Sequence, residues 1–88
     1  MRFKAKTNQL YSIMEGEMIL LDTDDGTYHE LNEIAAFVWM LLERTALSVS
    51  EISEQVCGEF EVDKSECETD MDLLLKQLVD EKLVEIII

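Results

Sequence analysis

Residues 27–42, TYHELNEIAAFVWMLL, change their pattern at Asn32, and this change decides the fold. The residues before Asn32 are β-prone and indicate a short strand. Asn32 is a favourable helix N-cap, and Glu33 places a negative charge at the positive end of the helix that follows. The apolar residues at helical spacing are Ile34, Phe37, Val38, Leu41 and Leu42. Trp39 lies outside this stripe, so we expect a helix that is buried on more than one side.

Two more β-prone runs precede this segment. They cover residues 10–14 and 17–22, with Glu15 and Gly16 between them, and the turn-forming residues 23–26 lead into the strand at 27–31. Two turn signals between three short runs predict a three-stranded antiparallel meander. Because the meander has only three strands, we expect its last strand to form an edge of the sheet.

Two more helices follow the first. Residues 48–51, SVSE, form a capping box that begins the second helix, and Gly58 is expected to end it in a left-handed conformation. Asp63 at an N-cap position, with Glu66 three residues later, begins the third helix, which we expect to run to about Glu81.

Residues 83–88, LVEIII, are short and rich in β-branched side chains, which indicates a C-terminal strand. The expected fold class is therefore α+β and winged helix-turn-helix-like. It consists of a three-stranded antiparallel sheet, three helices and a short terminal strand. With 88 residues, the chain has the length of a single domain, 1–88.

The charge narrows the range of partners. Twenty acidic residues face seven Lys and Arg, which gives a formal net charge of −13. Such a surface repels nucleic acid and anionic membranes, and it favours a neutral or basic partner. The third helix, which would enter a DNA groove in a winged-helix protein, carries more acids than lysines.

Few residues are available for catalysis or metal binding. His29 is the only histidine and Cys57 and Cys67 are the only cysteines, so we expect no metal site and no cofactor. No nucleophile and base can be paired, so we expect no enzymatic activity. The start of the chain lacks a signal sequence and no run is long enough to span a membrane, and both cysteines suit a reducing cytoplasm.

The remaining candidate site is a groove for a peptide. An open edge strand can accept an extended peptide by β-addition, and the third helix can supply the opposite wall. The expected strand residues are Thr27, Tyr28, His29, Glu30 and Leu31, and the expected helix residues are Cys67, Asp70, Leu74 and Gln77. Strand residues alternate between faces, and we expect Tyr28 to face the core margin. The alternative is that this helix flank is an ordinary solvated boundary.

The sequence resembles the PqqD family, named for a small protein of pyrroloquinoline quinone biosynthesis. The motif residues are 26–32, GTYHELN, followed by 35–42, AAFVWMLL, and the resemblance extends over about residues 10–84. The resemblance implies a domain that binds the leader of a ribosomally made, post-translationally modified peptide as an added strand. It further implies that Tyr28 and its neighbours pair with the leader, and that Asp70 and Leu74 line the helix side.

Two further expectations come with this resemblance. The bound precursor would be presented to a modifying enzyme, such as a radical SAM enzyme, or to a lasso-peptide leader protease. Lys82 departs from the family, which commonly has Gly before the final Leu-Val, so the turn there is expected to differ. The rival hypothesis is a structural or regulatory interaction module, for example a homodimer formed through the exposed edge or through residues 86–88.

Overall fold

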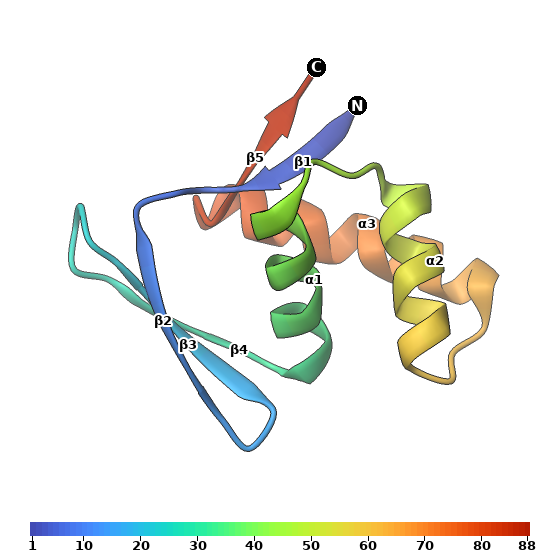
Figure 1. The fold of residues 1–88 in the computed structure, drawn as a ribbon. Helices are drawn as coiled ribbons and strands as arrows, with labels where there is room; N and C mark the ends of the chain where they lie inside the picture. Colours follow the sequence, from blue (N-terminus) through green and yellow to red (C-terminus); the bar gives the residue numbers. More distant parts are fainter.

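The computed structural model describes residues 1–88, and Figure 1 shows how its elements are arranged. In chain order they are β1 (Arg2–Ala5), β2 (Gln9–Met14), β3 (Glu17–Asp22), β4 (Tyr28–Leu31), α1 (Glu33–Arg44), α2 (Val49–Glu59), α3 (Lys64–Asp80) and β5 (Val84–Ile87). The three-stranded sheet has the order β2-β3-β4, and β1 pairs with β5 in a second sheet. The predicted α+β, winged helix-turn-helix-like architecture is confirmed.

Two turns set the register of the meander. Glu15 and Gly16 have φ angles of 53° and 83°, so the β2–β3 hairpin closes through a two-residue turn with both residues left-handed. The strands then pair from Gln9 opposite Asp22 to Met14 opposite Glu17. β4 pairs antiparallel with the other side of β3, from Met18 opposite Leu31 to Leu21 opposite Tyr28.

Helix α1 is the centre of the core, and Figure 1 shows it between the meander and the other helices. Trp39 is fully buried, and its indole N–H donates to the carbonyl oxygen of Leu83 at 3.1 Å. The buried residues of α1 are Ala35, Ala36, Val38, Trp39 and Leu42. Phe37 and Leu41 of the predicted stripe are only half-buried, whereas Ala35 and Ala36, which lie outside that stripe, are buried.

The N-terminal strand β1 was missing from the sequence prediction. Phe3 and Ala5 are buried and alternate with the more exposed Arg2 and Lys4, and β1 pairs antiparallel with β5. Four residues give too short a pattern to identify a strand without its partner, which lies at the other end of the chain. The pairing brings both termini to one side of the molecule, as Figure 1 shows.

The helix starts follow the predicted caps. The Ser48 hydroxyl accepts from the Glu51 backbone N–H at 3.2 Å, and the Glu51 carboxylate accepts from the Ser48 N–H at 2.9 Å. Asp63 caps α3. Its carboxylate accepts hydrogen bonds from the Ser65 hydroxyl and from the backbone N–H groups of Glu66 and Ser65, and these bonds hold the pKa of Asp63 below its usual value. The predicted stop at Gly58 is wrong, because α2 continues through it and Phe60, in extended conformation, is the C-cap.

The turn after α3 is made by Lys82. This residue has a φ of 62°, in the left-handed region that favours glycine. The Lys82 and Leu83 backbone N–H groups donate back to the carbonyl oxygens of Val79 and Leu78 at 3.0 Å, which closes the helix end. None of the helices is both long enough and apolar enough to cross a membrane.

Candidate functional site

β4 is an edge strand, as predicted, and a bulge determines which of its backbone groups are free. The Gly26 N–H donates to the Asp22 carbonyl and the Asp22 N–H donates to the Thr27 carbonyl, both at 2.9 Å, with Gly26 at a φ of 74°. Antiparallel pairs alternate between hydrogen-bonded and non-hydrogen-bonded types along the ladder. The backbone N–H and C=O groups of Tyr28 and Glu30 therefore point away from β3.

The loop before β4 is held by Asp25. Its carboxylate accepts from the Thr27 backbone N–H at 2.8 Å. This backbone hydrogen bond holds the pKa of Asp25 below its usual value. The contact fixes the backbone at Thr27, so β4 begins in a defined register.

A hollow of about 120 Å³ lies between β4 and the C-terminal half of α3. Its lining residues are Glu30, Leu31, Asn32, Ala35, Leu74, Gln77, Leu78 and Glu81. Leu31, Ala35 and Leu78 are buried, and Leu74 packs against the core from its edge. The hollow therefore has an apolar base, with amide and carboxylate groups at its rim.

One polar contact joins the two walls. His29 Nδ1 lies 3.2 Å from Glu81 Oε2, and the His29 side chain is 16% exposed. The second carboxylate oxygen of Glu81 accepts from the Gln77 side-chain amide at 3.1 Å. β4 and α3 are thus tied together by side chains beside the hollow, while the edge of β4 remains unpaired.

The two faces of β4 differ in burial. His29 and Leu31 face the core side, where Leu31 is 5% exposed. Tyr28 and Glu30 face outward, and Tyr28 is 68% exposed. The expectation that Tyr28 faces the core margin is therefore wrong. The bulge at Gly26 is the reason, since it sets which residues of β4 share a face with the buried residues of β3.

The predicted helix residues are separated by the structure. Leu74 and Gln77 line the hollow. Asp70 is exposed on α3, one turn before Leu74, and borders a different depression at the start of the helix. Cys67 is 2% exposed, and its Sγ lies 3.8 Å from the Ser53 carbonyl oxygen in α2, so it is not part of the groove wall. Burial raises the pKa of the Cys67 thiol.

Four lining residues, Asn32, Ala35, Leu78 and Glu81, were not identified from the sequence as groove residues. Asn32 had been assigned only as a helix cap, Ala35 lies one turn further along α1, and Leu78 lies one turn after Leu74 on α3. Glu81 ends α3, four residues after Gln77, and that spacing was the available signal for their contact. No group of three or more His, Cys, Asp or Glu side chains is placed to hold a metal ion.

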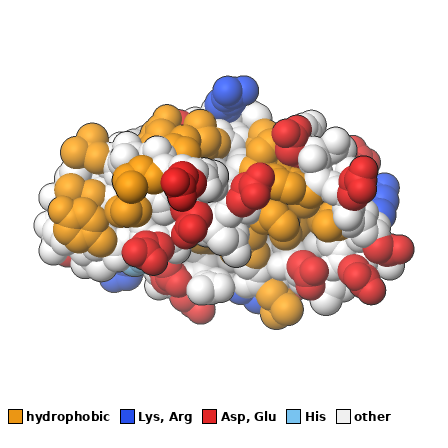
Figure 2. All heavy atoms as spheres, turned by 90° about the horizontal axis from the view of Figure 1, so that it is seen from below, with side chains coloured by type: hydrophobic (Ala, Val, Ile, Leu, Met, Phe, Trp, Pro, Cys, Tyr) orange, Lys and Arg blue, Asp and Glu red, His pale blue; other side chains and the backbone are white.

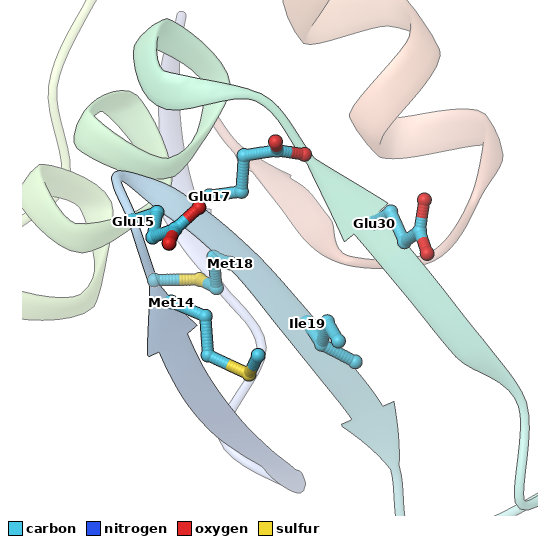
Figure 3. Close-up of a pocket in the computed structure, with 6 residues that line it drawn as sticks. All are labelled: Met14, Glu15, Glu17, Met18, Ile19 and Glu30. Atoms are coloured by element: carbon cyan, nitrogen blue, oxygen red, sulfur yellow. The ribbon is translucent and has the colours of Figure 1, made fainter.

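The outer face of the sheet carries an exposed apolar row. Leu10, Leu21 and Tyr28 are cross-strand neighbours on β2, β3 and β4. Figure 2, seen from below, shows apolar side chains gathered at the end of the molecule where the meander lies, with acidic side chains among them. In Figure 3, Glu30 on β4 lies beside Ile19 on β3, at the border between this face and the open edge.

Two solved structures share the fold over nearly the whole chain. One is described as TbiB1 in complex with the TbiA(beta) leader peptide; it has 28% identity and a TM-score of 0.82, and the match covers 97% of this chain and 98% of that one. The other, a lasso peptide synthetase B1 complexed with the leader peptide, has 25% identity and a TM-score of 0.75, with 96% and 98% covered.

A search of curated proteins gives no significant match to the chain. The family model described as coenzyme PQQ synthesis protein D (PqqD) matches residues 17–84, which include β3, β4 and all three helices. The match also includes the open edge of β4 and the α3 wall of the hollow. The chain therefore belongs to the PqqD family.

Proposed function

We propose that the groove between β4 and α3 binds the leader segment of a ribosomally made precursor peptide as an added strand. The observation that carries the proposal is the open edge of β4, where the backbone groups of Tyr28 and Glu30 point away from β3 beside the hollow lined by Leu74. The two similar solved structures support it, since both are described as complexes with a leader peptide.

Each part of the groove has a separate task in this proposal. The free N–H and C=O groups of β4 supply affinity through backbone hydrogen bonds. The hollow accepts an apolar leader side chain against Leu31 and Leu74, which fixes the register. Gln77 contributes at the rim, and Asp70, one turn away, accepts a basic leader residue at the end of the groove. Thr27 and His29 hold the pairing strand in place, Thr27 through its hydrogen bonds to Asp22 and Asp25 and His29 through its contact with Glu81.

The proposed role is that of an adaptor and not of an enzyme. The residues around the hollow are apolar side chains, amides and carboxylates, which suit binding. A bound leader places the core of the precursor at a high effective concentration near a modifying enzyme, such as a radical SAM enzyme, or near a leader protease. No cofactor and no metal take part in this role.

Titration with a synthetic leader of the precursor encoded beside the gene tests the proposal. We expect amide signals of Tyr28 and Glu30 to shift in nuclear magnetic resonance spectra and to become protected from hydrogen exchange. The backbone amides of Tyr11 and Ile13, which point to the open side of β2, serve as the internal control and should not change.

Two results would contradict the proposal. One is saturable leader binding that protects β2 and leaves β4 unaffected. The other is the absence of binding together with a stable dimer in sedimentation experiments, which would favour the self-association hypothesis. A dimer that pairs through β4 and dissociates when the leader is added would instead support the same open edge as the binding site.

A further inference from the structure

Glu30 occupies a distinctive position at the open edge. It lines both the hollow beside α3 and a depression on the outer face of the sheet that also contains Met14 and Ile19. Figure 3 shows Glu30 on β4 and Ile19 on the neighbouring strand β3, where the two residues are cross-strand partners. The ion pairs of the structure are Arg2–Glu51, His29–Glu81, Lys64–Glu54 and Lys76–Asp72. None of them includes Glu30, so its carboxylate makes no ion pair within the protein.

Tyr28 places an exposed aromatic ring on the same strand as Glu30. Its ring is 68% exposed, and it ends the row that begins with Leu10, itself 63% exposed, and continues through Leu21. A strand added to β4 would extend this row by one position. A side chain placed there would cover the Tyr28 ring, and cross-strand aromatic pairs of this kind are favourable.

The pairing of an added strand with β4 fixes how far apart its residues opposite Tyr28 and Glu30 lie. Tyr28 and Glu30 share the outer face, and both direct their backbone groups toward the added strand. The leader residues directly opposite them therefore also face outward and are separated by one residue, whichever way the leader runs. The residue between them faces inward, on the side of His29 and the hollow.

We infer that β4 selects leaders in which a Lys or Arg, placed opposite Glu30, is separated by one residue from an apolar or aromatic residue placed opposite Tyr28. This inference rests on the proposed binding of a leader strand at β4. It adds the chemical class of the leader, which would carry one cationic and one apolar side chain on the same face of its strand. The net charge of −13 favours cations everywhere, but only this register fixes their spacing from the apolar residue.

A random peptide library displayed on phage tests the inference, with the purified full-length protein as bait. Wild type is expected to enrich Lys or Arg two positions from an apolar residue, and the Glu30→Lys variant is expected to enrich Asp or Glu at that position instead. The matched control is Glu17→Lys, which makes the same charge change on β3, about 10 Å from the added strand. It should retain the wild-type preference.

Individual peptides from this selection provide the measurement. Replacing the selected Lys by Gln is expected to weaken binding to wild type by about two- to fivefold, and to have no effect on the Glu30→Gln variant. The inference would be overturned if the selected peptides bind the groove without a fixed spacing between the cation and the apolar residue. It would also be overturned if the Glu30→Lys variant selects the same peptides as wild type. Either result would leave leader binding itself intact. If no selected peptide protects β4, the proposed function itself fails.

Discussion

The β2–β3–β4 sheet has two edge strands, and their core-side residues are in different environments. On β4 these residues are His29 and Leu31, which are half-buried and buried. On β2 the corresponding residues are Tyr11 and Ile13, which remain 42% and 50% exposed. The β4 edge lies beside α3, with a hollow between them, whereas the depressions along β2 are lined by residues of the meander alone.

We propose the leader site at β4 because of this difference, since an unpaired backbone edge does not by itself select a side chain. Both edges offer free N–H and C=O groups, and both could pair with an extended chain. Only the β4 edge has a hollow whose far wall is a helix, because the depressions along β2 are formed by the meander alone. Affinity at an edge comes from the backbone, but selection requires the helix wall.

The strongest test of this comparison is the Leu74→Ala variant. Truncating a side chain that anchors a bound peptide should weaken leader binding by about 1–3 kcal/mol, measured by isothermal titration calorimetry. The matched control is Leu73→Ala, the adjacent residue of α3, which is 62% exposed and does not line the hollow. Equal effects of the two substitutions would show that α3 is not a wall of the site.

The two tyrosines of the chain provide the second test, one on each edge. The Tyr11 ring packs edge-on against Trp39, with centroids 5.5 Å apart, so Tyr11→Ala should lower the free energy of unfolding by about 1–2 kcal/mol. Tyr28 makes no such contact and is mostly exposed, so Tyr28→Ala should change it by less than about 0.5 kcal/mol. Denaturant unfolding of both variants measures this.

Leader binding should show the opposite order. Tyr28→Ala removes a ring beside the added strand and is expected to weaken binding, whereas Tyr11→Ala should leave the affinity unchanged at temperatures where it remains folded. A loss of binding with Tyr11→Ala alone would assign the leader to the β2 edge.

Most of the fold was predictable because its signals are local. The cap at Asn32 and the capping box at Ser48 depend on neighbouring residues, and both are formed in the structure. The strand β1 was not predictable in the same way, because the four residues Arg2–Ala5 are stabilised by β5 at the other end of the chain. Gly58 was misread because a helix tolerates an interior glycine, and neither its neighbours nor its spacing distinguish that case from a C-cap.

The site was predictable in outline but not in detail. The strand and helix that form the groove were identified from an edge and a mixed flank, and Leu74 and Gln77 lie where expected. The orientation of Tyr28 depended on the bulge at Gly26, which shifts the strand faces by one residue. The burial of Cys67 depended on how α3 rotates against α2, and helical periodicity alone does not fix that rotation.

The smallest expected effect concerns Lys82, whose carbonyl oxygen accepts from the Gln9 side-chain amide of β2 at 3.3 Å. Because Lys82 holds a left-handed φ of 62°, Lys82→Gly should relieve the steric cost of its Cβ and raise the free energy of unfolding. The greater freedom of glycine in the unfolded chain offsets part of the gain, which leaves about 0.5–1 kcal/mol. Lys82→Ala is the matched control, since it removes the same charge but keeps the Cβ, and it should not be stabilising.

Leader affinity should stay at the wild-type value in both variants, because the turn lies outside the lining of the hollow. If thermal or denaturant unfolding shows equal stabilisation by Gly and Ala, the effect comes from the lost charge, and the backbone of this turn is not strained.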